Sequence, residues 1–368
     1  SFTDADGVTI GQVNPTGITS DGDVAITAAT ITVDEDITTN GADVTLQATG
    51  GITHNADIAV ASNGGNITYQ VTDAPATSAV LIYGDIDASA TGSGGNVSIS
   101  GAFASSATTD EDPARAISGD TVSIKTDGTG TISINGDATN SGNTSKTAWG
   151  LQFTSLTLES DSGAINVTGT GGAKSNNSRG MAFDSETLKV LSQSGPITIT
   201  DNKPVGLTGT YNGLYLLPAS TDAIVLGADG STVPTSSSDV KIQADKVSFV
   251  TRDTDVTTSG TLTVEPVGTT FGAELTFQLV SLSGGVSGLT LGKAANTSGV
   301  TIGSATTIAG PITIYSDSIE VDAALKATDS TITFEGAAAD DTAGTVLNSS
   351  AGSITADNLL VKNIHQTE

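Results

Sequence analysis

The stretch TIGSATTIAGPITIYSDSIEVDAAL, residues 301–325, contains three strand-like phrases in single file, with almost no loop between them. In Ile312-Thr313-Ile314, β-branched side chains alternate with a hydroxyl side chain, which is the period-two pattern of a half-buried strand. Pro311 stands directly before this phrase, where a sheet tolerates a missing N–H group. The stretch therefore predicts short strands that follow one another through tight corners.

Phrases of the same kind recur along the whole chain. Val24, Val44, Ile67 and Val97 open phrases that start 20, 23 and 30 positions apart. Later phrases begin at Val122, Leu156, Leu188, Val240 and Leu262. A loose period within roughly 20 to 50 residues is typical of solenoids, propellers and arrays.

The joints between the phrases favour a solenoid over hairpins. Most of them lack the two-residue Asn-Gly or Asp-Gly turns that join antiparallel strands. Gly-Gly-Asn at 64–66 and at 94–96 supplies residues that accept positive φ immediately before a strand. A phrase of about 20 residues with three strands and three corners corresponds to one rung of a parallel β-helix. At about 4.8 Å per rung, some 12 to 15 rungs would form a rod of roughly 60 to 70 Å.

Composition agrees with an all-β chain that has a thin core. The 368 residues include 44 Gly, 4% aromatic and 14% charged residues, against about 25% charged in an average domain. The hydrophobic content of 36% is too high and too regularly spaced for a disordered chain. We therefore predict a β-solenoid with loop insertions at some corners, and an array of β-sandwiches is the alternative.

The charge balance narrows the range of partners. The net charge is −27, from 40 acidic and 13 basic residues, and no basic run is present. Nucleic acids and anionic membranes need clustered Lys and Arg, so we expect neither nucleic-acid binding nor membrane insertion. The absence of Cys excludes disulfides and thiolate metal sites. Strong negative charge does attract cations such as Ca²⁺.

Long corners and one irregular insertion interrupt the repeat. We expect β-helix rungs over 1–202, with long corners at 103–118 and 140–153, an irregular insertion at 203–235, and further rungs over 236–368. Long solenoid corners often build binding surfaces. The candidate binding residues are the aromatic ones, although such side chains often only bury area. They are Trp149, Tyr211 and Tyr215.

Pairs of acidic residues are the candidates for a Ca²⁺ site, the one cofactor that the sequence suggests. Asp-x-Asp in a turn supplies two or three of the six to eight oxygens that Ca²⁺ prefers. Neither an EF-hand loop nor a calcium-binding nonapeptide repeat is present, and solvated acidic corners are the alternative. The candidate residues are Asp4, Asp6, Asp21, Asp23, Asp34, Asp36, Asp110 and Asp112.

A catalytic interpretation has less support. Carbohydrate-active β-helices need two carboxylates about 5 to 9.5 Å apart, and neighbouring rungs would meet that spacing. His54 and His365 are too few and too isolated for a nucleophile–base pair, and we interpret them as polar surface residues. Asn-x-Ser/Thr sequons occur at strand-start corners such as Asn66 and Asn96, where Asn has a structural use of its own.

The phrases GADVTLQATGGITHNADI, SNGGNITYQ and GSGGNVSISG resemble the repeat region of filamentous-haemagglutinin-type exoproteins, the large bacterial adhesins of two-partner secretion. This resemblance covers most of residues 8–365. It implies a right-handed parallel β-helix, export across the outer membrane, and attachment to cells, surfaces or matrix. Asn14-Pro15-Thr16-Gly17 is the nearest match to the Asn-Pro-Asn-Gly motif of the family's secretion domain, and a simple turn is the alternative.

The sequence therefore predicts a secreted or cell-surface structural and adhesive protein, a stalk or adhesin segment without catalytic activity. Its expected partner is a glycan or protein of a host cell, surface or matrix. The alternative is a subunit of an extracellular filament that assembles head to tail through open strand edges. A β-helical carbohydrate-active enzyme is the third interpretation.

Overall fold

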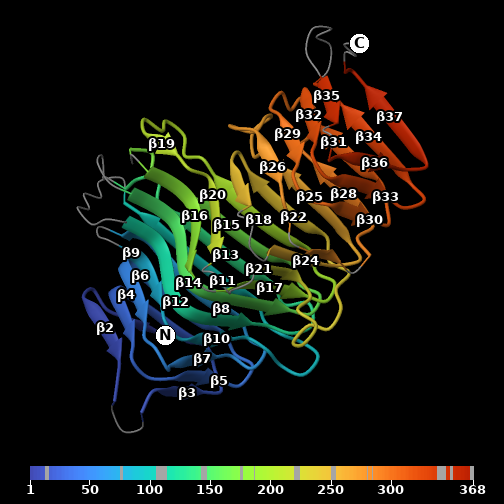
Figure 1. Ribbon diagram of the computed structural model, residues 1–368. Helices are drawn as coiled ribbons and strands as arrows, with labels where there is room; N and C mark the ends of the chain where they lie inside the picture. Colours follow the sequence, from blue (N-terminus) through green and yellow to red (C-terminus); the bar gives the residue numbers. More distant parts are fainter. Residues whose placement is uncertain are drawn as a thin grey trace.

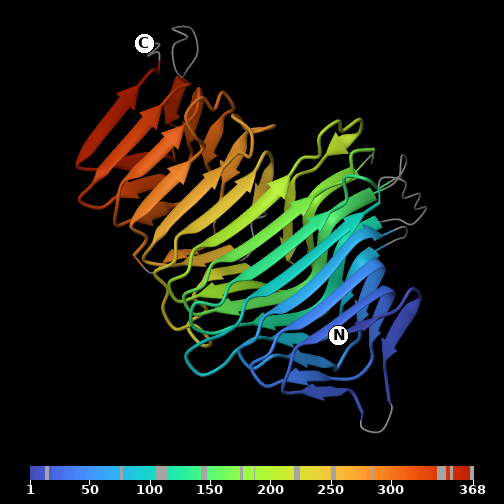
Figure 2. The ribbon, with the colours of Figure 1, turned by 180° about the vertical axis from the view of Figure 1, so that it is seen from behind.

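The chain forms a parallel β-helix in a computed structural model (Figures 1 and 2). The strands stack along one axis, with the N-terminus at one end and the C-terminus at the other. The residues that the structure describes contain no helix, and hence no helical segment capable of crossing a membrane. These residues are 1–12, 16–74, 78–104, 114–141, 147–174, 177–185, 187–218, 224–249, 254–279, 281–283, 285–337, 345–348 and 351–364.

Each rung places a strand, or part of a strand that bends around a corner, on each of three faces. In the stretch quoted first, β31 lies on the first face, β32 on the second and β33 on the third, and the chain then returns to the first face. The three expected phrases therefore belong to five strands, β29 to β33, because the strands are shorter than the phrases suggested. The prediction of three strands and three corners per rung is confirmed.

The first face is hydrogen-bonded continuously from one end of the described chain to the other. Its strands are β1 (Phe2–Thr3), β4 (Val24–Val33), β6 (Val44–His54), β8 (Ile67–Ala74), β11 (Val97–Phe103), β13 (Ile132–Asp137), β15 (Ile165–Thr170), β18 (Ile197–Asn202), β22 (Val240–Ala244), β25 (Thr261–Glu265), β28 (Gly288–Leu291), β31 (Ile312–Tyr315), β34 (Thr331–Glu335) and β37 (Asn358–Lys362).

The second face includes the later residues of β4 and β6, which bend around the corner. Its other strands are β2 (Gly7–Ile10), β9 (Ser78–Ile82), β12 (Ala114–Lys125), β14 (Thr147–Ser160), β16 (Asn177–Ser185), β19 (Thr210–Tyr211), β20 (Leu214–Pro218), β23 (Val247–Phe249), β26 (Leu275–Phe277), β29 (Val300–Ile302), β32 (Ser318–Val321) and β35 (Thr345–Asn348).

The third face includes the later residues of β12 and β14. Its other strands are β3 (Ile18–Ser20), β5 (Ile37–Thr39), β7 (Ala59–Ala61), β10 (Asp85–Asp87), β17 (Leu188–Ser192), β21 (Ile224–Gly227), β24 (Thr254–Thr257), β27 (Ser281–Ser283), β30 (Thr306–Ile308), β33 (Ala324–Ala327) and β36 (Ser353–Thr355).

A column of inward aliphatic side chains runs along the first face in strict register. It confirms the alignment of Val24 with Val44, Ile67 and Val97. Val122, however, aligns with Leu156 and Leu188 on the third face, so the recurring phrases do not all belong to one face. The first-face column consists of Val24, Val44, Ile67, Val97, Ile132, Ile165, Ile197, Val240, Leu262, Leu289, Ile312, Ile332 and Leu359.

One hydrophobic core fills the interior from Ile10 to Phe334. It is narrow, as the composition predicted, and its largest fully buried side chains include Tyr69, Phe153 and Phe277. Full burial of a Val, Leu or Ile side chain contributes about 1.5–3 kcal/mol, so the stacked columns are the main source of stability.

Glycines at the corner between the third and first faces allow neighbouring rungs to approach closely. A Cβ atom on Gly65 would lie 2.1 Å from the Ala42 carbonyl oxygen, and one on Gly95 would lie 1.9 Å from the Gly65 oxygen. Of the four Gly in the two Gly-Gly-Asn segments, only Gly64 has a positive φ. The predicted reason for these glycines was therefore wrong at the other three positions, where contact with the neighbouring rung excludes a side chain.

The segments expected to be irregular contain regular strands. Within 203–235, β20 pairs with β16 and β21 pairs with β17 in the ordinary register. Among the described residues of 203–235, those outside strands lie in the corner before β20, which also contains β19, and in the segment after β21, while 219–223 lie outside the described residues. Likewise 114–118 belongs to β12 and 147–153 to β14, while 105–113 and 142–146 lie outside the described residues.

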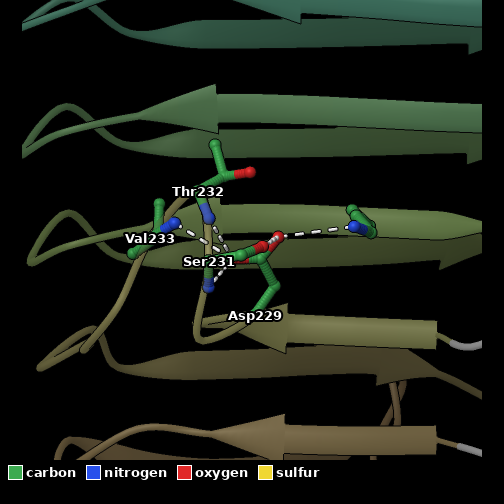
Figure 3. A network of polar contacts seen from close by, with 5 residues as sticks. Asp229, Ser231, Thr232 and Val233 are labelled. Atoms are coloured by element: carbon green, nitrogen blue, oxygen red, sulfur yellow. Dashed lines mark hydrogen bonds and ion pairs between the residues drawn. The ribbon is translucent and has the colours of Figure 1, made fainter.

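A loop after β21 is ordered around one carboxylate (Figure 3). Asp229 Oδ1 accepts hydrogen bonds from the backbone N–H groups of Ser231, Thr232 and Val233 at 3.0, 2.7 and 3.0 Å. Partial burial alone would raise the pKa of Asp229, but these donors and Lys189 hold it well below its usual range. The loop thereby packs Val233 into a small second core with Leu191, Val225 and Ala228, and Asp229 has a structural function.

Candidate functional site

Lysine side chains gather on the corner between the first and second faces, in a chain that is otherwise strongly acidic. This corner carries one Lys on each of three successive rungs, between β15 and β16, between β18 and β20, and between β22 and β23, and another two rungs later. These residues are Lys174, Lys203, Lys246 and Lys293. In the corner segments of these five rungs the acidic residues are Asp245 and Glu274.

Contacts between rungs join these corner segments into one surface. The Thr208 backbone N–H donates to the Ala173 carbonyl at 3.0 Å. On the next rung the Leu214 N–H donates to the Lys246 carbonyl at 2.9 Å, and beyond it the Gly268 N–H donates to Asp245 Oδ1 at 3.0 Å. The Thr270 hydroxyl then donates to the Asn296 side-chain oxygen at 3.0 Å. The corner is therefore a continuous feature over five rungs.

A groove of about 420 Å³ lies on this corner and crosses three rungs. We call it the lysine groove, and its walls include Lys203, Leu207, Tyr211, Asp245, Lys246 and Thr270. Lys203 is exposed and Lys246 half-buried. Asp245 Oδ1 accepts the Gly268 N–H, and the Lys293 ammonium donates to the Val267 carbonyl at 3.0 Å nearby.

Tyr211 is held in place by a hydrogen bond to the first face. Its hydroxyl donates to the Asp201 backbone carbonyl at 3.1 Å, and the half-buried ring lines the groove. Burial also raises the pKa of Tyr211. The structure places Tyr211 in the wall of this groove, and its function in binding stays a prediction. Tyr215 pairs with Ala182 through the backbone of β20.

A buried carboxyl group lies beneath the groove. Asp201 is fully buried in a column of small residues, between Gly169 on one rung and Ala244 on the next. Burial raises the pKa of Asp201 to about 8. Tyr211 and nearby backbone N–H groups partly oppose this rise, but no described group completes a hydrogen bond to either carboxylate oxygen.

Trp149 does not lie on a projecting loop. It is a strand residue of β14 and only 8% exposed, so the prediction that a long corner presents it was wrong. The Arg179 guanidinium lies 5.2 Å from the centre of its ring, a cation–π contact between neighbouring rungs. The alternation of apolar residues in TAWGLQF was the signal for a strand at this position.

The candidate Ca²⁺ ligands lie at several corners. In each described pair at least one carboxylate accepts a hydrogen bond of its own. Asp4 Oδ1 accepts the Asp6 N–H at 2.9 Å, Asp23 Oδ1 the Asp43 N–H at 3.1 Å, and Asp36 Oδ1 the Ala59 N–H at 2.9 Å. Asp34 accepts from the Asn55 side chain, and Asp21 is exposed beside Gly22.

Asp110, Asp112, Asn14 and Pro15 lie outside the described residues. Within the described part of the chain, no three His, Cys, Asp or Glu side chains form a group that could hold a metal ion. The structure thus brings none of the described candidates together as a multidentate site, and Ca²⁺ binding stays a prediction.

Two of the sequon asparagines bond neighbouring rungs at the strand-start corner. The Asn66 backbone N–H and side-chain amide both donate to Asp43 Oδ1, at 2.7 and 3.1 Å. Asn66 Oδ1 in turn accepts the Asn96 N–H at 2.9 Å, and Asn96 Oδ1 accepts the Thr131 N–H at 2.9 Å. The structural use predicted for Asn at this corner is confirmed.

His54 lies in the core, so its interpretation as a surface residue was wrong. The side chain is 0% exposed and stands in an inward column of the second face, between Val33 and Ile82. Burial lowers the pKa of His54 to about 4, although the Ile58 carbonyl and nearby acidic residues oppose this shift. His365 lies outside the described residues.

Comparisons with known proteins do not place the chain in a family. No protein-family model, no curated protein and no solved structure matches it.

The lysine groove itself was not visible from the sequence. The intervals between the lysines of this corner are irregular, at 29, 43 and 47 residues from Lys174 to Lys293, because the strands and corners differ in length from rung to rung. The register of the rungs is needed to show that these lysines share a corner.

Proposed function

We propose that this chain is a secreted or cell-surface structural and adhesive protein, a rod-like stalk that mediates attachment to cells, surfaces or matrix, without catalysis. The observation that carries this proposal is the continuous first face. Fourteen strands from β1 to β37 stack in parallel, so 13 spacings of about 4.8 Å give a rod of about 60 Å.

The distribution of polar and apolar groups supports a function as a spacer. Apolar columns fill the interior, and the outward positions of the first face carry hydroxyl and amide side chains such as Thr68, Ser98 and Asn166. Every rung is fixed to its neighbours by backbone hydrogen bonds and aliphatic packing, so the body resists bending. A rigid body with a net charge of −27 stays soluble and extended away from other acidic surfaces.

The adhesive part of the proposal rests on the lateral surface. The lysine groove crosses three rungs and combines charged, hydroxyl and aromatic groups, which are the groups that orient a polar ligand. The expected partner is a glycan or a protein of the surface to which the rod attaches, and secretion or surface display is the location that such a function requires.

Beads that carry the purified chain test this function. They should adhere to cultured cells or matrix films more strongly than beads coated with an unrelated acidic β-protein of equal net charge. Equal adhesion of the two bead types, on cells and on matrix alike, would contradict the proposal.

A filament subunit is the second candidate, favoured by an exposed apolar strand. In β37, Leu359, Leu360 and Val361 are 53%, 42% and 38% exposed, and Leu359 continues the buried aliphatic column of the first face. A second copy stacked on this strand would extend both the column and the backbone hydrogen bonds.

Negative-stain images of the pure chain test this alternative. Uniform fibres that the variant Leu359→Lys/Val361→Lys abolishes would support head-to-tail assembly, and discrete rods of both proteins would exclude it. Recording the images with Ca²⁺ and then with a chelator tests the predicted acidic Ca²⁺ sites in the same experiment.

A further inference from the structure

We propose that the lysine groove binds an acidic polysaccharide with one carboxylate per sugar, a uronate polymer, which lies along the corner between the first and second faces. This inference rests on the proposed adhesive function and names the class of its ligand. It is carried by the spacing of the lysines, by the local charge, and by the groups that line the groove.

The spacing of the cations matches a polymer that repeats. Lys174, Lys203 and Lys246 lie on three successive rungs, and Lys293 lies two rungs later. Each rung advances by about 4.8 Å, so the backbone positions of the four lysines span about 19 Å along the rod. This advance is close to the length of one pyranose residue in an extended chain. A uronate polymer therefore presents about one carboxylate for each rung.

The local charge is opposite to that of the whole protein. The corner segments of the five rungs carry four Lys and two acidic residues, whereas the chain carries 13 basic and 40 acidic residues. Both acidic side chains already accept a hydrogen bond. Gly268 N–H donates to Asp245 at 3.0 Å, and the Thr301 hydroxyl donates to Glu274. The corner therefore attracts anions, although the net negative charge of the protein repels them from the rest of its surface.

The charge density of the ligand also favours a uronate polymer over a nucleic acid. Double-stranded DNA carries one negative charge per roughly 1.7 Å of its axis, and its binding needs many neutralised phosphates. A body with a net charge of −27 repels such a polymer more strongly than one with a single charge per sugar. The cations are also lysines, which act as point charges, rather than the forked arginines that select phosphate.

The remaining walls suit the neutral part of a sugar. Tyr211 and Leu207 supply apolar surface, and Thr270 supplies a hydroxyl. The Tyr211 ring is fixed by the bond from its hydroxyl to the Asp201 carbonyl, so little side-chain freedom is lost on binding. The groove volume of about 420 Å³ lies within the roughly 300–1,000 Å³ range of small-ligand sites.

Isothermal titration with hexagalacturonate, a linear uronate hexamer, tests the proposal on the full chain. Wild type should bind it, with an affinity that falls as salt is added, and should not bind maltohexaose, a neutral hexamer. Lys203→Ala/Lys246→Ala should weaken binding at least tenfold, and Tyr211→Ala should weaken it with the charge unchanged.

The matched control is Lys326→Ala/Lys362→Ala, which removes the same charge from the third face and from β37. It should change the affinity less than twofold. An equal loss in the control would show non-specific attraction and overturn the proposal, as would tighter binding of a sulfated hexamer or of single-stranded DNA. Circular dichroism of each variant confirms that the strands are retained.

The adhesive function and the uronate ligand can be contradicted separately. If beads coated with the chain adhere to cells or matrix while hexagalacturonate does not bind, the uronate proposal is overturned and the adhesive function stands. If the beads do not adhere but the hexamer binds at the groove, the ligand class stands and the adhesive function is overturned.

Discussion

The Nδ1 atom of His54 lies 3.2 Å from the Tyr69 hydroxyl inside the aliphatic core of the β-helix. Both side chains are 0% exposed. His54 Nε2 lies 3.1 Å from the Ile58 carbonyl, so Nε2 carries the proton and Nδ1 accepts from Tyr69. Each side chain thereby gives the other a hydrogen-bond partner. Without a partner, a buried polar group would lower the free energy of unfolding by about 1–3 kcal/mol.

The pair should behave as one unit in a double-mutant cycle. Tyr69→Phe leaves Nδ1 without a donor, and His54→Leu leaves the Tyr69 hydroxyl without an acceptor, so each should lower the free energy of unfolding by about 1–3 kcal/mol. The double variant should lose less than the sum of the two. Urea unfolding measures all four proteins, and losses that simply add would show that the two side chains are independent.

His54 should make the protein sensitive to acid. Its folded pKa of about 4 lies below the unfolded value of about 6.5, so the unfolded chain binds an extra proton between these two values. Stability from this group is complete above about pH 6.5 and is lost as the pH falls towards 4. His54→Leu should flatten this part of the stability profile, measured as the melting temperature from pH 7 to 4. A profile as steep as that of wild type would assign the acid sensitivity to other groups.

Asp201 should have the opposite pH dependence. Its folded pKa of about 8 lies above the unfolded value of about 3.9, so the folded protein holds the extra proton between these values. Its contribution is largest below about pH 4 and falls, by about 1 kcal/mol per pH unit, until about pH 8.

The variant Asp201→Asn isolates this effect, because an amide cannot ionise. It should be more stable than wild type at pH 8, and its advantage should shrink towards pH 5. Asp120→Asn, at an exposed corner, is the matched control and should show no such trend. Equal pH slopes for wild type and Asp201→Asn would contradict the buried, protonated carboxyl.

The Asn66 side chain should stabilise the strand-start corner more than an Asn elsewhere on the surface. The Asn66 side-chain amide donates to Asp43 Oδ1 and its oxygen accepts from the Asn96 N–H, whereas Asn166 is exposed on the outer first face. Asn66→Ala should cost about 0.5–1.5 kcal/mol, and Asn166→Ala should stay within about 0.5 kcal/mol of wild type. Thermal unfolding of both variants measures this difference. Equal effects would show that the side-chain hydrogen bonds of Asn66 do not stabilise this corner.

The period-two alternation predicted the parallel solenoid because it is a local property of each strand. Phrases such as Ile312-Thr313-Ile314 contain their own evidence of one buried and one exposed face. The register between rungs is not local. Val122 and Val97 open similar phrases, yet they lie on different faces, since strands on all three faces have the same pattern.

Buried polar residues were equally hard to predict. His54 takes a position that aliphatic side chains occupy on the rungs before and after it, and only the partner 15 residues later explains its burial. The lysine groove was hard to predict for the same reason. Its residues come together through the register of unequal rungs, whereas the alternation within each phrase depends on neighbouring residues alone.

Gly163 should be among the positions least tolerant of a side chain. A Cβ atom there would lie 1.8 Å from the Gly130 carbonyl oxygen on the preceding rung, and the three nearest atoms all belong to backbone, which prevents a cheap adjustment. Gly163→Ala should therefore lower the free energy of unfolding by more than about 2 kcal/mol, through forced separation of the two rungs. Gly22→Ala is the matched control, because nothing lies within 4 Å of its added Cβ and its φ is not positive. That variant should be neutral or slightly stabilised, by up to about 1 kcal/mol, since Ala restricts the unfolded chain. Urea unfolding of both variants measures the difference. Equal stability would mean that the rungs can separate freely at this corner, which close stacking of the β-helix does not allow.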